Sequence, residues 1–416
     1  MSQLRITGGH RLSGEVYIHG AKNSVLPILA ATVLVPGVSV IRNCPDLSDV
    51  RASLAILEHL GCKTVRQEDT VTVDASQLTG CTVPDELMRE MRSSVIFLGA
   101  ILARTGCVRL SLPGGCELGP RPIDLHLAAM GALGARVELG SDGLHCSADG
   151  LTGTEINLAL PSVGATENIM LAACGAEGTT VILNAAREPE IADLQTFLNA
   201  VGGRVRGAGS SVIVIEGNRQ FHGGEHTVMG DRIVAATYLS AAAAAGGDVT
   251  VRGVDWRHLS TVTAVLCQAG CHVCSDGGEV RLVCGKPLKA VRPIHTAPYP
   301  GFPTDAQAPV MAALTTARGS TMFVEHMFES RYRHVDELAR MGANIRVEGR
   351  VAVVTGVDRL HGSAVQATDL RGGAALAVAA LGAEGESVLT GLHHVDRGYE
   401  RLEQDLCALG AQVMRI

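Results

Sequence analysis

Apolar and polar residues follow a pattern that recurs six times along this chain. Each unit contains a helix-like segment that ends in an apolar residue and a glycine, followed by a strand-like run of alternating apolar residues. Glycine is common just after a helix, and runs rich in Val, Ile and Thr favour strands. These glycines lie 68–73 residues apart, and they are Gly61, Gly134, Gly202, Gly270, Gly342 and Gly410.

A second series of glycines is interleaved with the first. It follows alanine-rich helical segments and precedes β-branched strands at intervals of 66–72 residues, at Gly37, Gly106, Gly178, Gly247, Gly319 and Gly385. Each unit is therefore expected to hold two strand–helix pairs and a hairpin. Such intervals are too long for a solenoid of small helical repeats. They indicate an α/β protein of two domains, each with three repeats and pseudo-threefold symmetry.

The two ends of the chain are predicted to meet in one domain. The sixth unit stops at residues 411–416 without a partner for its last strand, and residues 4–6 form an apolar strand that can supply it. We therefore expect a first domain of residues 22–229 and a second domain of residues 1–21 and 230–416. The helices are rich in Ala and Gly, so they can pack closely inside each domain, with the sheets outside them.

The composition indicates a globular protein and argues against two classes of partner. The chain has 416 residues, 46% hydrophobic and 19% charged, which is enough for two cores. A net charge of −7 without a cluster of basic residues argues against nucleic acid. The apolar stretch 234–245 is too short for a membrane span, and no signal-peptide pattern follows Met1. We expect a cytoplasmic protein.

The chain contains twelve cysteines, for which a reducing compartment is the expected setting. The spacing of cysteine and histidine in residues 271–284 suggests a zinc site. The alternation of residue types there favours a hairpin instead, and no second close pair of ligands follows. We predict no metal site. Six other cysteines occur in apolar patterns and are expected to be small buried residues: Cys62, Cys107, Cys146, Cys174, Cys267 and Cys407.

One loop, residues 113–122, combines glycines, prolines, a thiol and a guanidinium. Arg121 lies near Cys116 in sequence and favours its thiolate, the reactive form. A helix-like segment begins at once after the loop, so backbone N–H groups and Arg121 can converge on an anion. The alternative is an ordinary surface loop with a free thiol. The combination favours chemistry on a phosphorylated small molecule.

Charged residues open several of the alanine-rich helical segments. Three are aspartates, which suit helix capping: Asp231, Asp305 and Asp369. Lys22, Arg92 and Arg371 oppose the helix dipole, and an anion bound at these helix starts would remove the conflict. Asp305 also ends a second proline–glycine loop. It is either a helix cap or a general base for a substrate hydroxyl, and the sequence leaves both open.

Several longer motifs are distributed in order along the chain. They are Gly20-Ala21-Lys22-Asn23, Met91-Arg92-Ser93-Ser94, Pro113-Gly114-Gly115-Cys116, Gly119-Pro120-Arg121-Pro122, Ser162-Val163-Gly164-Ala165-Thr166, Ala186-Arg187-Glu188-Pro189-Glu190, Pro303-Thr304-Asp305, Ala367-Thr368-Asp369-Leu370-Arg371 and His394-Val395-Asp396-Arg397-Gly398-Tyr399-Glu400-Arg401. With these motifs the chain closely resembles the UDP-N-acetylglucosamine 1-carboxyvinyltransferase family, enolpyruvyl transferases that begin peptidoglycan precursor synthesis. The resemblance implies a two-domain inside-out α/β barrel with the active site in the cleft between the domains.

The resemblance also implies a reaction and its catalytic residues. The enolpyruvyl group of phosphoenolpyruvate is transferred to the 3-hydroxyl of UDP-N-acetylglucosamine by addition and elimination, without a cofactor. Cys116 protonates the methylene carbon of the donor, and Asp305 is the general base for the acceptor hydroxyl. The full implied catalytic set is Lys22, Asn23, Cys116, Asp305, Asp369 and Arg397.

Further residues are implied in substrate binding. Lys22, Arg121 and Arg397 hold the donor anions, and Asn23 and Asp305 contact the acceptor. The remaining set is Arg92, Pro122, Ile123, Asp124, Leu125, Ser162, Val163, Gly164, the backbone near Met327, Arg331 and Arg371. Leu160-Pro161 stand where many relatives have a lysine, so one diphosphate contact differs.

Two alternatives stand beside this prediction. The shikimate-pathway enolpyruvyl transferase shares the fold and the donor but lacks a lid cysteine. A nucleotide-sugar sensor without catalysis is the second, and the presence of Lys22, Cys116, Asp305 and Arg397 argues against it. The sequence implies small-molecule substrates, no nucleic acid and no membrane, and it says nothing of protein partners.

Overall fold

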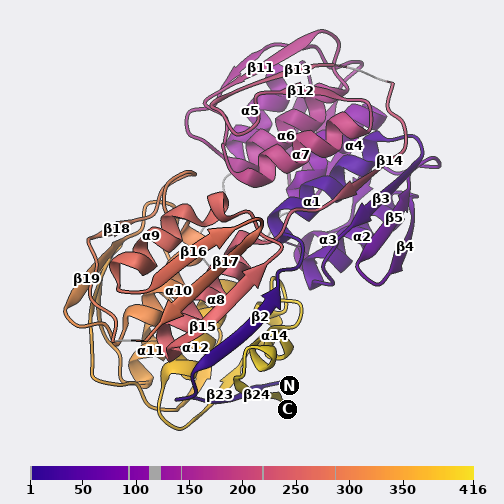
Figure 1. Ribbon diagram of the computed structural model, residues 1–416. Coiled ribbons are helices and arrows are strands. Elements are labelled where there is room, and N and C mark those ends of the chain that lie inside the picture. The colour runs from indigo at the N-terminus through magenta and orange to yellow at the C-terminus, as the bar shows by residue number, and fades with distance from the viewer. Residues whose placement is uncertain (1, 92–93, 112–122, 142, 218–219, 286) are drawn as a thin grey trace. The chain divides into compact units, whose positions relative to one another are not determined.

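The computed structural model describes residues 2–416 except 92–93, 112–122, 142, 218–219 and 286, and the chain forms two compact units (Figure 1). Of the described residues, the first unit holds 20–111 and 123–229, and the second unit holds 2–19 and 230–416. Each unit has its own apolar core. Among the helices described, none is both long and apolar enough to traverse a lipid bilayer.

The first unit contains three four-stranded sheets with one topology. An edge strand pairs in parallel with its neighbour, which pairs antiparallel with a hairpin of two further strands. In spatial order the sheets are β14 (Gly224–Thr227), β3 (Val38–Arg42), β5 (Thr70–Asp74) and β4 (Lys63–Gln67); β6 (Thr82–Val83), β7 (Cys107–Leu110), β9 (Gly143–Ser147) and β8 (Arg136–Gly140); and β10 (Glu155–Asn157), β11 (Thr179–Leu183), β13 (Val212–Glu216) and β12 (Arg204–Arg206).

The second unit repeats this topology three more times. Its sheets are β2 (Leu12–Tyr17), β15 (Gly247–Arg252), β17 (Glu279–Cys284) and β16 (His272–Asp276); β18 (Ile294–His295), β19 (Ser320–Val324), β21 (Val351–Thr355) and β20 (Asn344–Glu348); and β22 (Ala364–Gln366), β23 (Glu386–Thr390), β1 (Leu4–Thr7) and β24 (Gln412–Arg415). The six predicted repeats therefore correspond to six sheets.

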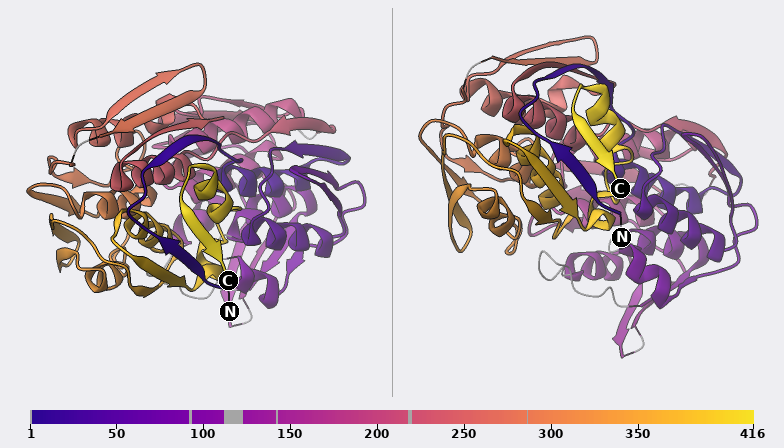
Figure 2. Two further views of the ribbon diagram at one scale, coloured as in Figure 1. Left: turned by 60° about the horizontal axis from the view of Figure 1, so that its bottom comes forward. Right: turned by 90° about the horizontal axis from the view of Figure 1, so that it is seen from below.

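Both ends of the chain complete the sixth sheet. β1 pairs antiparallel with β24, with Leu4 opposite Arg415 and Thr7 opposite Gln412. On its other side β1 pairs antiparallel with β23. The predicted pairing of the first and last strands is confirmed, and the two termini lie side by side (Figure 2).

Helices rich in small residues form the centre of each unit. In the second unit α8 (Arg232–Ala245), α10 (Thr304–Leu314) and α12 (Leu370–Gly382) pack against one another and are buried along most of their length, and Figure 1 shows α8 behind the strands of its sheet. In the first unit α4 (Phe97–Thr105) packs against α1 (Lys22–Ala31) and α6 (Val163–Cys174). The predicted arrangement, helices inside and sheets outside, is confirmed.

Further helices complete each unit. In the first unit these are α2 (Ser48–His59), α3 (Asp85–Glu90), α5 (Asp124–Ala132) and α7 (Pro189–Ala200), with short 3₁₀ segments at Thr32–Leu34 and Ser94–Ile96. In the second unit they are α9 (Ser260–Gln268), α11 (Val335–Arg340), α13 (Leu392–Val395) and α14 (Leu402–Ala408), with a 3₁₀ segment at Trp256–Leu259.

The cysteine predictions are only partly correct. The hairpin expected over residues 271–284 is present as β16 and β17. Cys62, Cys146 and Cys174 are buried and Cys107 is half-buried, but the prediction was wrong for Cys267 and Cys407, which are exposed. Each follows a buried leucine, Leu266 or Leu406, and the next helix position is rotated by about 100° to the solvent side.

Candidate active site

The carboxylate of Asp305 lies between two buried guanidinium groups in the second unit. Its Oδ1 accepts a hydrogen bond from Arg331 at 2.8 Å, and its Oδ2 accepts one from Arg371 at 3.0 Å. The arginine side chains are 2% and 3% exposed, whereas that of Asp305 is 26% exposed. The two guanidinium groups therefore fix the plane of a carboxylate that solvent can still reach.

Asp305 does not occupy the capping position that the sequence left open for it. It is the second residue of α10, and the preceding cap residue, Pro303, makes no side-chain capping bond. The other two aspartates do cap their helices. Asp231 accepts from two backbone N–H groups at the start of α8, and Asp369 does the same at the start of α12. This difference separates Asp305 from the structural aspartates.

A buried glutamate holds the start of α10 in place. Glu325 is fully buried, and its carboxylate accepts a hydrogen bond from the hydroxyl of Thr304 at 2.9 Å. It also accepts from the backbone N–H groups of Met327 at 2.7 Å and Phe328 at 3.2 Å. The N–H of Met327, in the segment expected to contact the nucleotide, is thus already used by the protein. Any contact between this segment and the nucleotide must therefore use its other backbone groups.

Arg371 remains charged although it is buried. Burial disfavours its charge, but Asp305, Tyr399 and Asp231 outweigh this effect and raise the pKa of Arg371 above its ordinary value. Its guanidinium donates to the Tyr399 hydroxyl at 3.4 Å, and that hydroxyl hydrogen-bonds to Thr237 at 2.8 Å. A chain of polar groups therefore fixes Arg371 against the carboxylate of Asp305.

His334 lies beside the start of α12, where an added Cβ on Gly372 would stand 2.9 Å from the Cβ of His334. It is fully buried, and neither ring nitrogen has a partner among the described residues. Burial lowers the pKa of His334 to about 4; the positive charge of Arg331 adds to this effect, and Asp369 opposes it. The ring is therefore neutral near pH 7 and adds no third positive charge beside Asp305.

Lys22 forms a buried ion pair in the first unit. It opens α1, and its Nζ lies 2.6 Å from Oδ2 of Asp49, in the first turn of α2; the side chains are 9% and 1% exposed. The sequence indicated that a bound anion would be needed to offset a cation at this helix start. Asp49 already supplies a negative charge. Asn23, the next residue of α1, is exposed.

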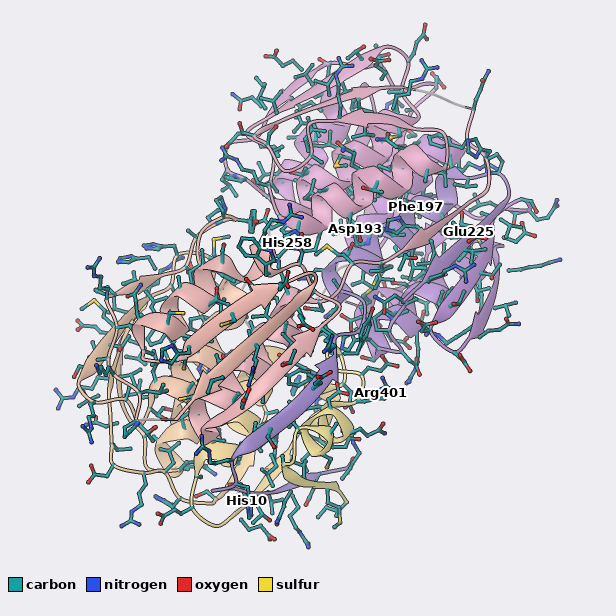
Figure 3. All side chains as sticks on the ribbon, in the orientation of Figure 1. His10, Asp193, Phe197, Glu225, His258 and Arg401 are labelled. Atoms are coloured by element: carbon teal, nitrogen blue, oxygen red, sulfur yellow. The ribbon has the colours of Figure 1, made fainter. Side chains whose placement is uncertain are left out.

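The start of α1 is tied to the segment that leaves the first unit. Asp193, on α7, accepts from Ser24 at 2.5 Å, from Nε2 of His226 at 3.0 Å and from the backbone N–H of Met229 at 3.2 Å. Figure 3 labels Asp193 with Phe197 one turn further along the helix, and the Phe197 ring meets that of His226 edge-on. One carboxylate thus orders the residues next to Lys22 and Asn23.

Two segments expected to bind the nucleotide lie together at helix starts. The ring of His126, in the first turn of α5, faces Gly164, in the first turn of α6, where an added Cβ would stand 3.1 Å from the ring. Ser162 caps α6, and its hydroxyl accepts from the N–H of Ala165 at 3.4 Å. Of the expected residues here, Asp124 is exposed. The others are half-buried: Ile123, Leu125, Ser162, Val163 and Gly164.

The remaining expected residues divide into two groups. Arg397 is half-buried in the turn after α13, in the second unit. Arg92, Cys116, Arg121 and Pro122 lie outside the described residues. Their expected roles stay predictions.

Comparison with known proteins gives the family. A family model described as EPSP synthase (3-phosphoshikimate 1-carboxyvinyltransferase) matches residues 6–406. The chain belongs to this family of enolpyruvyl transferases. A relative named UDP-N-acetylglucosamine 1-carboxyvinyltransferase 2, from Caldanaerobacter subterraneus subsp. tengcongensis, is 51% identical over 416 residues, which cover 100% of both chains.

Two crystal structures of enolpyruvyl transferases share the fold. The enolpyruvyl transferase NikO from Streptomyces tendae matches with a TM-score of 0.90 at 28% identity, over 100% of this chain and 99% of that chain. An EPSP synthase from Acinetobacter baumannii matches with a TM-score of 0.75 at 18% identity, over 100% of each chain. The predicted two-domain inside-out α/β barrel is therefore confirmed as the fold of this enolpyruvyl transferase.

Four polar residues that contact or adjoin the expected site residues were not identified from the sequence. They are the buried residues Asp49, Glu325 and His334 and the half-buried Asp193. The partners of these residues lie on other elements, such as Lys22 for Asp49 and Thr304 for Glu325. The only sequence signal was a polar residue at a position where the pattern expects an apolar one.

The free energy of unfolding should decrease as the pH falls below about 6.5. The folded state keeps His334 neutral down to a pKa of about 4, whereas the unfolded chain protonates it near the ordinary value of 6.5. The unfolded state therefore binds more protons in this window, and His334 alone should cost about 2 kcal/mol between pH 7.5 and pH 5. Urea unfolding of wild type and His334→Gln at both pH values measures this difference.

His334→Gln should lose less stability than wild type on acidification, because glutamine does not titrate. The matched control is His10→Gln, at an exposed histidine of the same unit (Figure 3), and it should behave as wild type. An equal loss in wild type and His334→Gln would show that His334 takes up its proton equally in both states.

Proposed function

We propose that this chain transfers the enolpyruvyl group of phosphoenolpyruvate to the 3-hydroxyl of UDP-N-acetylglucosamine and releases phosphate. The observation that carries the proposal is its 51% identity, over the whole length of both chains, to a relative named for that activity. The reaction is the first committed step of peptidoglycan precursor synthesis, in cell-wall biogenesis. We propose the cytoplasm as its location, which suits the free thiols at the eleven described cysteines.

The clamped carboxylate of Asp305 suits a general base. The sugar hydroxyl attacks C2 of phosphoenolpyruvate while C3 gains a proton from Cys116. The C2–O bond to phosphate then breaks, and C3 loses a proton to give the enolpyruvyl ether. Each carboxylate oxygen can accept more than one hydrogen bond, so contacts with Arg331 and Arg371 are compatible with binding a hydroxyl. A fixed carboxylate plane lowers the cost of orienting the reacting groups.

Three cations are proposed to bind the donor. Lys22, Arg121 and Arg397 hold its phosphate and carboxylate. An ammonium has three N–H donors, so the Lys22 contact with Asp49 is compatible with a further contact to phosphate. Asn23 contacts the acceptor hydroxyl, and Asp369 supports the site by capping α12. The starts of α5 and α6, with Arg92 and the segment near Met327, are proposed to bind the nucleotide sugar.

Transfer to shikimate 3-phosphate is the second candidate. It is favoured by the description of the matching family model, EPSP synthase. Low sequence identity argues against this candidate, because the EPSP synthase from Acinetobacter baumannii is only 18% identical to this chain. A nucleotide-sugar sensor remains as an alternative that would release no phosphate.

Phosphate release distinguishes these candidates. With phosphoenolpyruvate present, UDP-N-acetylglucosamine should support release, and shikimate 3-phosphate should support none above background. The control is each acceptor without phosphoenolpyruvate. Release with shikimate 3-phosphate but not with UDP-N-acetylglucosamine would reverse the assignment. No release with either acceptor would favour the sensor.

Asp305→Ala should lower turnover by about a hundredfold to ten-thousandfold, the usual cost of losing a general base. Binding of the nucleotide sugar, measured by calorimetry, should change far less. Asp305→Asn keeps the shape between the two arginines and should also be slow. The control is Asp248→Ala, at an exposed aspartate paired with Arg281 in the same unit. Turnover of Asp305→Ala within a few fold of wild type would exclude the general-base role.

Cys116 should be the first thiol alkylated by fosfomycin, a small anionic epoxide. Its proximity in sequence to Arg121 favours the thiolate, and the epoxide resembles the donor that Lys22 and Arg397 are proposed to bind. UDP-N-acetylglucosamine should accelerate the reaction. Cys116→Asp should keep some turnover and resist the epoxide.

Exposure does not distinguish one reactive thiol, because Cys267, Cys274 and Cys407 are all exposed. Peptide mapping after partial inactivation provides the comparison. Modification mainly at one of those three cysteines, in step with loss of turnover, would contradict the role of Cys116.

A further inference from the structure

One buried amide joins three helices of the first unit. Asn168, on α6, is fully buried, and its Oδ1 accepts the backbone N–H of Gly99, on α4, at 2.7 Å. Its Nδ2 lies 3.0 Å from the carbonyl oxygen of Val95 and 2.9 Å from Nδ1 of His126, on α5. All three contacts are within normal hydrogen-bond distance.

The orientation of this amide is determined by its backbone partners. A backbone N–H can only donate, so the group facing Gly99 must be the amide oxygen. A carbonyl oxygen can only accept, so the group facing Val95 must be the NH₂. The packing of α4 against α6 leaves room only for glycine at this point, because an added Cβ on Gly99 would stand 2.2 Å from the backbone carbonyl oxygen of Asn168.

The amide orientation in turn determines the state of His126. The NH₂ of Asn168 has two hydrogens, of which one bonds to Val95 and the other points at Nδ1 of His126. Nδ1 must therefore accept, and a neutral ring then carries its hydrogen on Nε2. A proton on Nδ1 would place two donors against each other in a site where His126 is 7% exposed. Burial lowers the pKa of His126 to about 4, with Asp124 opposing this shift.

The Nε2 side of the ring lies at the start of α6. An added Cβ on Gly164 would stand 3.4 Å from Nε2 of His126 and 3.1 Å from its Cε1. Gly164 belongs to the Ser162–Gly164 segment proposed above to bind the nucleotide sugar, and Asp124 and Leu125 directly precede His126. An uncharged N–H donor is therefore held among proposed nucleotide-binding residues.

We propose that Asn168 is a positioning residue that holds His126 as the neutral Nε2–H tautomer and so presents a fixed hydrogen-bond donor to an oxygen of the nucleotide-sugar acceptor. A ring without this constraint would exchange between tautomers, and only one of them offers a donor on Nε2. The identity of the ligand rests on the proposed function, whereas the tautomer rests on the contacts of Asn168 alone.

The tautomer can be measured without substrate. Long-range ¹H–¹⁵N correlation spectra of the full chain, labelled with ¹⁵N-histidine, distinguish the two neutral tautomers and the imidazolium. His126 should show an unprotonated Nδ1 and a protonated Nε2 at pH 7, and the same state at pH 5.5. The signal that His126→Gln removes assigns the residue. A protonated Nδ1 in wild type at pH 7, in either the neutral ring or the imidazolium, would overturn the proposal.

Asn168→Asp tests the consequence for binding. A carboxylate only accepts, so His126 should change to a form protonated on Nδ1. The Kd for UDP-N-acetylglucosamine, measured by calorimetry without phosphoenolpyruvate, should rise about tenfold to a hundredfold, as expected for a misplaced polar contact. The control is Asn199→Asp, in the same unit, where the asparagine side chain bonds only to the backbone of Val205 among the contacts described.

The outcomes separate this proposal from the proposed function. A changed tautomer with an unchanged Kd would overturn the positioning role and leave the function intact. Wild type that shows the expected tautomer but binds no UDP-N-acetylglucosamine would overturn the proposed acceptor and leave the tautomer assignment standing. If Asn168→Asp does not fold, the wild-type spectrum still decides the tautomer, and the Kd of His126→Gln, expected to rise as well, decides whether the donor contributes to binding.

Discussion

The close packing of the central helices is the constraint on which the rest of this structure depends. α8, α10 and α12 are surrounded by one another and by other elements of their unit, so their middle turns accommodate mainly small or apolar side chains. An added Cβ on Gly382 of α12 would stand 2.9 Å from the carbonyl oxygen of Ala244 on α8. Long charged side chains therefore fit only at the helix starts, where free backbone N–H groups also require acceptors.

Burial at these helix starts requires that charged groups have partners. An isolated buried charge costs several kcal/mol or more. Arg331 and Arg371 both contact Asp305, Lys22 contacts Asp49, and Glu325 accepts four hydrogen bonds. These contacts involve only groups of the protein itself, so the fold orients the groups proposed for catalysis. Preorganisation of this kind reduces the reorganisation needed during reaction.

The sequence predicted what depends on local pattern. The repeat glycines predicted six repeats, and each corresponds to one sheet. The unpaired last strand predicted the pairing of β1 with β24, and Asp231 and Asp369 are the helix caps that their positions suggested. The function of Asp305 was ambiguous because its partners are distant in sequence. Arg331 lies 26 residues away and Arg371 lies 66 residues away, and no local pattern connects them. The ion pair of Lys22 with Asp49, on the neighbouring helix, could not be predicted for the same reason.

Proton NMR of the product formed in D₂O tests the addition–elimination mechanism. In this mechanism the acceptor hydroxyl adds to C2 while C3 is protonated, and elimination follows. The intermediate has a methyl group at C3 that gains one solvent deuteron and then loses one of its hydrons. We expect an enolpyruvyl ether at the 3-oxygen of UDP-N-acetylglucosamine whose vinyl resonances are partly lost to deuterium. A vinyl product without deuterium, or phosphate release without a vinyl ether, would contradict the addition–elimination mechanism.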